Sequence, residues 1–258
     1  MRNTIRTNIK GGLYKLAPLA LFIVAWYLFT VGHPRRVFFL GSPKGFFLEL
    51  YVGLKTKVLL RDLWTTGTEA ISGLMIGNAA GAAVGFWMWR SRAISRILSP
   101  YIIVLGSAPL FAFAPIIVLG FGIGWISKVV VVIVSTFFTA LVQSFRGAEE
   151  ADPQLIEVVR SFGGDERQAL RKVVVPSSLV WVASALRINV GLALLGAFLG
   201  EYISSEGGLG HRILLAGNLY NTSLVLVAVM LFGVLGLLMS WGIARAATYA
   251  TRRIIAKL

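Results

Sequence analysis

The stretch DPQLIEVVRSFGGDERQALRKVVVP, residues 152–176, is the longest polar segment of a chain that is otherwise strongly apolar. Apolar runs long enough to cross a membrane stand on both sides of it. A water-soluble helical element between two membrane spans predicts a docking site for a soluble partner. An ordinary amphipathic connector between spans is the alternative.

The first half of this segment has the pattern of a short amphipathic helix. Asp152 can cap the helix, and Pro153 suits its first position. The apolar residues recur at helical spacing and form one stripe: Leu155, Val158, Val159 and Phe162. Gly163 permits the left-handed turn with which many helices end. We expect the stripe either to pack on the membrane-spanning helices or to fill a groove in a partner.

The second half predicts another short helix. Asp165 can cap it, and Gln168 stands where a capping box would place it. Arg171 and Lys172 suit its C-terminal end, where positive charge is favourable. Pro176 is expected to stop or kink this helix just before the next span. The segment is thus predicted to be two short helices, joined by a glycine turn, along the membrane face.

The composition of the whole chain indicates an all-α membrane protein. Hydrophobic residues make up 57% of its 258 residues, whereas a soluble domain has about 45–50%. The chain has no cysteine and two distant histidines, so neither a disulfide framework nor a metal site is predicted. The net charge of +14 would suggest nucleic acid in a soluble protein. Here much of it flanks apolar runs, so we expect a lipid membrane as the partner and no nucleic acid.

Six runs are candidates for membrane-spanning helices, because each offers about 20 mostly apolar residues. They are residues 13–31, 66–89, 100–121, 128–144, 178–199 and 224–244. The second run carries a glycine at every fourth position: Gly73, Gly77, Gly81 and Gly85. This spacing places all four glycines on one face, where another helix can approach closely.

The distribution of Lys and Arg predicts the orientation. Six spans put both termini on one side, and the segments on that side hold more Lys and Arg than those opposite. We therefore expect both termini, and residues 152–176, in the cytoplasm. The basic loop after the first span argues the other way, and its residues 46–60 could form an interfacial helix. The expected division is an anchor helix with a basic outer loop (1–62) and a core domain (63–258) that contains the 152–176 helices.

At this point the chain resembles a known family. Glu157-Val158-Val159, then Gly163, then Val173-Val174-Val175-Pro176 is similar to the "EAA" signature of permease subunits in ATP-binding-cassette (ABC) importers. The family pattern is Glu-Ala-Ala, three residues, Gly, and a spacer to an aliphatic-Leu-Pro close. Valines replace both alanines and the leucine, which keeps the apolar character and adds β-branched bulk.

The resemblance extends over most of the chain. Residues 62–85 look like the glycine-rich second span of the nitrate, sulfonate and taurine branch. That branch's third span is matched by Ser99-Pro100, Ala108-Pro109, Ala114-Pro115 and Phe121-Gly122-Ile123-Gly124. Glu201 and Gly208-Leu209-Gly210 match its Glu-to-Gly-Leu-Gly stretch after the fifth span.

The resemblance implies a type I importer permease with the MetI-like fold of six transmembrane helices. Two permease copies, as a homodimer, would form the pathway for a small anionic solute such as nitrate, sulfonate or taurine. Two ATPase subunits, which bind ATP and Mg, would dock beneath, and a soluble binding protein would deliver substrate outside. The permease would be a transport subunit without catalytic residues, in a bacterial or archaeal inner membrane. In keeping with this, the chain has no Gly-Lys dipeptide and so no phosphate-binding P-loop.

Two sets of residues are therefore expected to carry function. The ATPase-coupling set is Glu157, Val158, Val159, Phe162, Gly163, Arg167 and Pro176. The set proposed to line the pathway is Ser107, Pro109, Arg187, Asn189 and Glu201. Arg187 could contact an anionic substrate, or it could only reach the membrane surface or pair with residues 152–176. Glu201 could belong to a gate or a binding-protein contact, or to a solvated outer loop. Glu69 is expected at the membrane interface, with a role in the pathway as the alternative.

Two other functions fit the composition less well. A stand-alone secondary transporter or channel would need ionisable groups or paired broken helices inside the spans, and few ionisable residues lie there. A membrane-embedded enzyme would need clustered Asp, Glu or His at membrane depth. The acidic residues instead concentrate around the polar segment: Glu149, Glu150, Asp152, Glu157, Asp165 and Glu166.

Overall fold

The structure is a computed structural model that describes residues 17–18, 20–204 and 206–255. Its regular elements within these ranges are all helical, as the composition predicts. The chain divides into two compact units, residues 1–61 with 212–230 and residues 62–211 with 231–258. The second unit contains the polar segment and most of the predicted site residues.

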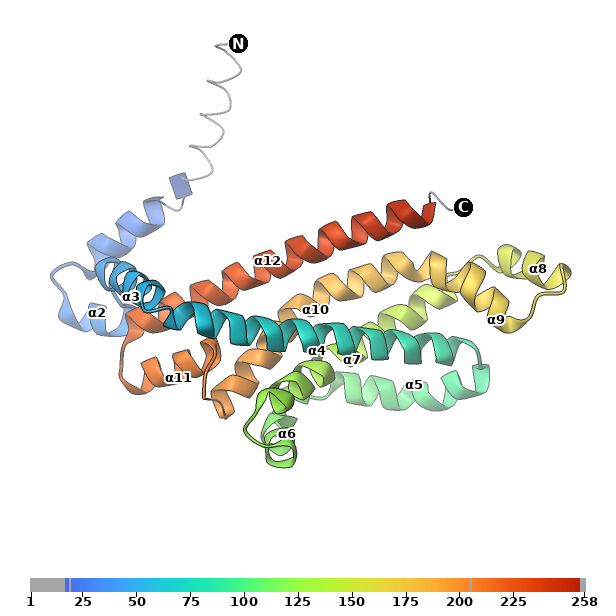
Figure 1. The fold of residues 1–258 in the computed structure, drawn as a ribbon, viewed down its shortest axis with the longest axis horizontal. Coiled ribbons are helices and arrows are strands. Elements are labelled where there is room, and N and C mark those ends of the chain that lie inside the picture. Colours follow the sequence, from blue (N-terminus) through green and yellow to red (C-terminus); the bar gives the residue numbers. More distant parts are fainter. Residues whose placement is uncertain (1–16, 19, 205, 256–258) are drawn as a thin grey trace, which may run out of the picture. The chain divides into compact units, whose positions relative to one another are not determined.

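Four long helices contribute buried residues to the core of the second unit: α4 (Val58–Trp89), α7 (Trp125–Glu149), α10 (Val175–Ile203) and the part of α12 (Thr222–Ile255) from residue 231 on (Figure 1). The predicted glycine stripe of α4 lies against α7. A Cβ at Gly81 would stand 2.8 Å from the Cβ of Ala140, and one at Gly85 would stand 2.7 Å from the Leu141 carbonyl oxygen. The stripe is therefore filled by α7 of the same chain, since no side chain larger than hydrogen fits there.

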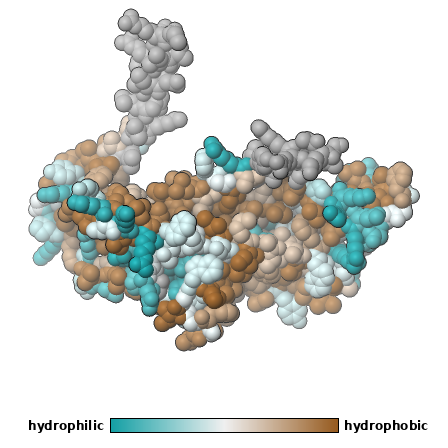
Figure 2. All heavy atoms as spheres, viewed as in Figure 1, coloured by the Kyte–Doolittle hydropathy of each residue, from teal (hydrophilic) through white to brown (hydrophobic). Residues whose placement is uncertain are grey.

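Four helices are long and apolar enough to cross a membrane among the described residues. They are Val58–Trp89, Trp125–Glu149, Glu166–Ile203 and Thr222–Ala246, the last within α12 (Thr222–Ile255). Two pairs of helices, each joined at a bend, also meet the length and hydropathy requirements when taken together. The described residues thus contain up to six spans if each pair is one span. Figure 2 shows apolar residues over much of the visible face, as lipid contact requires.

The predicted third span is broken. It consists of α5 (Arg92–Ser107), a 3-10 turn (Leu110–Phe113) and α6 (Ala114–Phe121), with a bend of 79°. Pro109 directly precedes the 3-10 turn, where its missing N–H costs no helical hydrogen bond. Pro115 lies in the first turn of α6, so it begins a helix and does not break one.

The N-terminal part differs from the expectation. Of the predicted span 13–31, residues 13–16 and 19 lie outside the described residues, and Ala20–Thr30 is a shorter apolar helix. The supposed outer loop is instead α2 (Pro34–Leu40) and α3 (Pro43–Lys55), which together pass as a bent span. Gly41, with φ of 64°, follows the end of α2, and Pro43 begins α3. The helix considered for residues 46–60 overlaps α3.

Candidate functional site

The segment 152–176 folds as its local pattern predicts. The Asp152 carboxylate accepts a hydrogen bond of 2.8 Å from the Gln154 N–H and so caps α8 (Pro153–Ser161). Gly163 has φ of 78°, the left-handed conformation in which glycine carries no Cβ penalty. The Asp165 carboxylate accepts a 2.8 Å bond from the Gln168 N–H and caps α9 (Glu166–Ala169). We call residues 152–176 the coupling segment.

The apolar stripe of α8 is largely uncovered within the described structure. Phe162 is 89% exposed, and Leu155 and Val158 are each more than half exposed, while Val159 is half-buried. The residue that anchors α8 to the rest of the chain is Ile156, which packs on a small core of Ala148, Ala151 and Val174. The stripe therefore does not pack on this chain's own membrane helices, and its apolar surface is available to another molecule.

Charged residues of the coupling segment lie on its surface. Arg160 donates to Glu166 across the glycine turn, and this exposed ion pair links α8 to α9. Glu157 and Arg167, both assigned to coupling by resemblance, are exposed. Hydrophilic residues gather over this end of the unit in Figure 2. All of these side chains are thus placed where a water-soluble partner could reach them.

Pro176 does not stop a helix, contrary to the expectation. A π turn (Leu170–Val174) joins α9 to α10, and the whole path from Glu166 to Ile203 is one helix of 38 residues. The Val175 N–H bonds to the Leu170 carbonyl, five residues back. Pro176 lies in the first turn of α10, where this wider turn accommodates its missing N–H.

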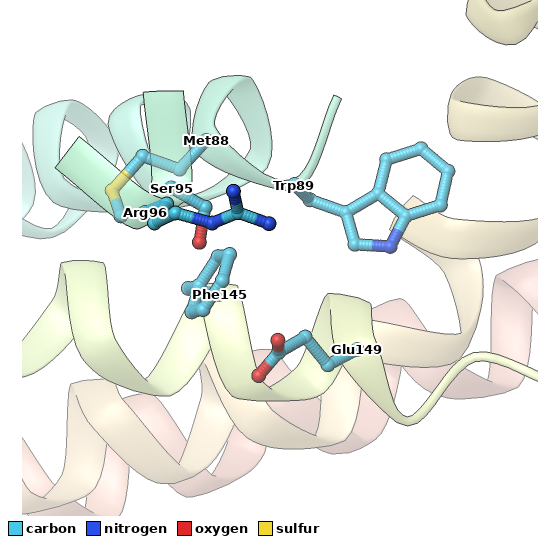
Figure 3. A pocket seen from close by; sticks show the side chains of 6 residues that line it. All are labelled: Met88, Trp89, Ser95, Arg96, Phe145 and Glu149. Carbon is cyan, nitrogen blue, oxygen red and sulfur yellow. The ribbon is translucent and has the colours of Figure 1, made fainter. Parts of the chain in front are cut away.

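Two cavities flank the coupling segment. One of about 470 Å³ lies between the adjoining ends of α4 and α5 and the end of α7, and Figure 3 shows Arg96 and Trp89 across it from Phe145 and Glu149. The other, of about 350 Å³, shares Trp89 and Glu149 and reaches Glu157. The second cavity is lined by Ile156, Glu157 and Arg160 of α8, and the stripe residues line neither cavity.

The residues proposed to line the pathway are not gathered in one place by the structure. Pro109 and Arg187 are exposed, and Ser107 is the last residue of α5, with its side chain outside the described ones. Asn189 is fully buried: its amide donates to the Asn78 side-chain oxygen (3.0 Å) and the Thr136 carbonyl (2.9 Å). Asn189 therefore ties α10 to α4 and α7.

Glu201 is buried at the far end of α10 and not in a solvated loop. Its exposed fraction is 0%. One carboxylate oxygen accepts from the Thr66 hydroxyl (2.6 Å) and the other from the Gly210 N–H (2.7 Å). Thr66 in turn accepts from the Leu209 N–H (2.9 Å), and Asp62 accepts from the Gly208 N–H (3.2 Å). Three consecutive backbone donors thus meet three buried acceptors.

Glu69, which was expected at the membrane interface, is buried against other helices of this chain. It and Lys128 are each 2% exposed, and Lys128 interacts electrostatically with both Glu69 and Glu201. We call Asp62, Thr66, Glu69, Lys128 and Glu201 the buried polar cluster. Burying several carboxyl groups is costly unless a cation and hydrogen bonds compensate them. Here backbone donors bond to Asp62 and Glu201, and Lys128 supplies a nearby positive charge, whereas one buried oxygen of Glu69 has no hydrogen-bond partner in the part of the chain that the structure describes.

Of this cluster, only Glu201 was assigned to the pathway set from the sequence. The sequence does contain a pattern for three other members, because Asp62, Thr66 and Glu69 follow one another at helical spacing on one face of the glycine-rich helix. Three polar residues on one face of a span indicate a buried partner. The partners Lys128 and Glu201 are far along the chain, so the pattern alone does not identify them.

Comparison with known proteins gives the class. Residues 73–248 match the family described as binding-protein-dependent transport system inner membrane component. The chain belongs to this family, and it is a permease subunit of an ABC importer.

Several curated proteins are similar along most of their length. A probable ABC transporter permease of Brucella melitensis is 26% identical, with 91% of this chain and 94% of that protein covered. The putative aliphatic sulfonates transport permease SsuC of Escherichia coli K12 is 28% identical, with 89% of each chain covered. The formylaminopyrimidine transport permease ThiX of Halalkalibacterium halodurans is 30% identical, with 79% and 82% covered.

Solved structures confirm the fold. An inward-facing conformation of the MetNI methionine ABC transporter contains a chain that aligns with a TM-score of 0.67 at 21% identity, over 76% of this chain and 97% of that one. A chain of an amino acid ABC transporter aligns with a TM-score of 0.57 at 18% identity, over 79% and 97%. The predicted MetI-like permease fold is therefore confirmed.

Proposed function

We propose that this permease carries a small anionic solute across the membrane and is driven by a separate ATPase that docks on the coupling segment. The observation that carries this proposal is the uncovered stripe of α8, above all Phe162. A helix with an exposed apolar face, fixed at both ends by caps, suits insertion into a groove of a partner. The contacting residues would be Glu157, Val158, Val159, Phe162, Gly163 and Arg167, with Pro176 at the start of the helix that transmits the motion.

The orientation follows from the same proposal. The coupling segment and both termini would lie in the cytoplasm, with ATP and Mg bound by the partner ATPase dimer. A second copy of this chain would complete the pathway, and a soluble binding protein would deliver substrate on the opposite side.

The anionic cargo is supported by two features. Arg187 is an exposed cation within α10, a membrane-spanning helix, where an ionisable group suggests a functional role. One relative is named for aliphatic sulfonates, which are anions. Another is named for formylaminopyrimidine, so nitrate, sulfonate and taurine stand as candidate solutes to be tested by uptake.

The test replaces Phe162 with Asp and measures co-purification with a co-expressed ATPase subunit that is recovered with the wild-type chain. A charge on the stripe should lower the recovered ATPase at least tenfold, because an anchor that fills a partner's pocket contributes about 2 kcal/mol or more. Leu219→Asp is the matched control, since Leu219 is 77% exposed and is not part of the coupling segment but follows α11 (Leu209–Asn218). Equal recovery of ATPase with Phe162→Asp and wild type would refute docking at α8. Uptake by the purified chain without any ATPase would refute the proposal as a whole.

A further inference from the structure

The buried polar cluster holds the backbone of one turn in a way that simple packing does not require. Gly208, Leu209 and Gly210, which we call the Gly-Leu-Gly turn, donate their N–H groups in order to Asp62, Thr66 and Glu201. These are the free N–H groups at the start of α11, which a helix normally satisfies with local caps. Here the acceptors come from two other helices, α4 and α10.

Only glycine fits at the first and last positions of this turn, Gly208 and Gly210. Gly208 has φ of 99°, and a Cβ there would collide with the Glu201 carboxylate. A Cβ on Gly210 would stand 2.7 Å from the Phe198 carbonyl oxygen and 2.9 Å from the Cβ of Glu201. Gly207, one residue earlier, has open space around its Cβ position. The close approach is therefore specific to the turn that faces Glu201.

Glu201 stands at the end of a continuous helical path. The helix from Glu166 to Ile203 has 38 residues, which is roughly 55 Å at the usual rise per residue. Its first residues belong to the coupling segment, and Glu201 lies in its last turn. Asn189 in its middle bonds to α4 and α7, so the path is also tied to its neighbours along its length.

We propose that Glu201 is a positioning residue that makes the Gly-Leu-Gly turn part of the same rigid body as α10 and α4. When the coupling segment moves, this turn, at the opposite end of the helix, would then move with it as part of the same rigid body. The inference rests on the proposed function for its driving step, the docking of the ATPase. The part of the proposal in which Glu201 holds the Gly-Leu-Gly turn rests only on the hydrogen bonds and glycine contacts described above.

The first experiment tests whether Glu201 holds the Gly-Leu-Gly turn, and it needs no ATPase. Amide hydrogen exchange of residues 207–211 is measured on the purified full chain in lipid nanodiscs. Glu201→Gln keeps the shape but offers one acceptor oxygen where two are used, so exchange should rise about tenfold. Gly208→Ala should do the same by displacing the carboxylate. The matched controls Glu206→Gln, an exposed acid in the same loop, and Gly207→Ala should leave exchange unchanged. Unchanged exchange in both Glu201→Gln and Gly208→Ala would overturn the proposal.

The second experiment tests the movement. The chain has no cysteine, so spin labels can be placed at Trp64→Cys on α4 and Glu206→Cys beside the turn, both exposed positions. In the complex with its ATPase, the distance between the labels should stay the same when ATP and vanadate trap the closed state. The added Glu201→Gln change should broaden the distance distribution, while the unfolding temperature of the chain stays within a few degrees.

Labels that separate on trapping in the otherwise wild-type complex would overturn the proposal, as would an unbroadened distribution in Glu201→Gln. A failure of the ATPase to bind would appear in co-purification and not in the exchange measurement, so the two proposals fail separately.

Discussion

The coupling segment and the buried polar cluster occupy the two ends of the same long helix and are built in opposite ways. The coupling segment is exposed, and each of its caps is made by a residue two or three positions away. The buried polar cluster is enclosed by the protein, and three of its hydrogen bonds join residues more than a hundred positions apart. One end thus leaves apolar side chains uncovered within the described structure, whereas the other joins distant parts of the same chain. Substitutions at the two ends should therefore have different effects, mainly on stability at the buried polar cluster and mainly on coupling to ATP hydrolysis at the coupling segment.

The largest effect is expected from the cation of the buried polar cluster. Lys128→Met keeps the length of the side chain but leaves Glu69 and Glu201 without their neighbouring positive charge. We expect the free energy of unfolding to fall by about 3 kcal/mol, because the buried carboxyl groups lose the nearby cation that offsets part of their desolvation cost. The measurement is denaturant unfolding of the purified chain in mixed micelles. Lys172→Met, an exposed lysine of the coupling segment, should change stability by less than about 0.5 kcal/mol. Similar losses from both substitutions would contradict the contrast between the two ends.

An intermediate effect is expected at the glycine turn of the coupling segment. Gly163→Val places a β-branched residue at φ of 78°, which costs about 1–2 kcal/mol and shifts the turn. Transport should be uncoupled, so that substrate no longer stimulates ATP hydrolysis by the assembled complex. Gly163→Asn should keep most of the stimulation, because Asn tolerates the left-handed conformation. Normal stimulation in the valine variant would remove the turn from the coupling path.

The smallest effect is expected from the ion pair on the surface of the coupling segment. Arg160→Ala removes the bond to Glu166, two side chains that are each about half exposed. Solvent screens such a pair, so stability should fall by less than about 1 kcal/mol, and less at high salt. The same unfolding assay at low and high salt provides the check. A loss as large as that from Lys128→Met would show that the coupling segment is stabilised as strongly as the buried end.

The sequence predicted the coupling segment well because its structure is decided locally. Caps, a left-handed glycine and an apolar stripe are each visible within a few residues. The one local error was Pro176, since the pattern does not reveal that a π turn carries the helix past it. The glycine stripe was also predicted correctly, because its period of four residues places it on one face.

The buried polar cluster was predicted only in part, for a physical reason. Whether Glu69 is buried or exposed depends on Lys128 and Glu201, which reach it only after the helices pack. In the basic segment after the first span, the helix considered for residues 46–60 overlaps α3, whereas α2 was not predicted. The boundary between them consists of a left-handed glycine after the last turn of α2 and a proline in the first turn of α3, which are normal helix boundaries.

The burial of Glu69 has a consequence for how the chain is made. Ribosomes deliver α4 and α7 before α10, so Glu69 and Lys128 reach the membrane while Glu201 is still unsynthesised. An unpaired charge at the centre of a membrane helix costs about 3 kcal/mol during insertion. Glu69 and Lys128 are available to each other before Glu201 is made, and their approach would lower this cost. The bond from Gly210 to Glu201 can form only after α10 is complete, so the buried polar cluster is completed late in translation.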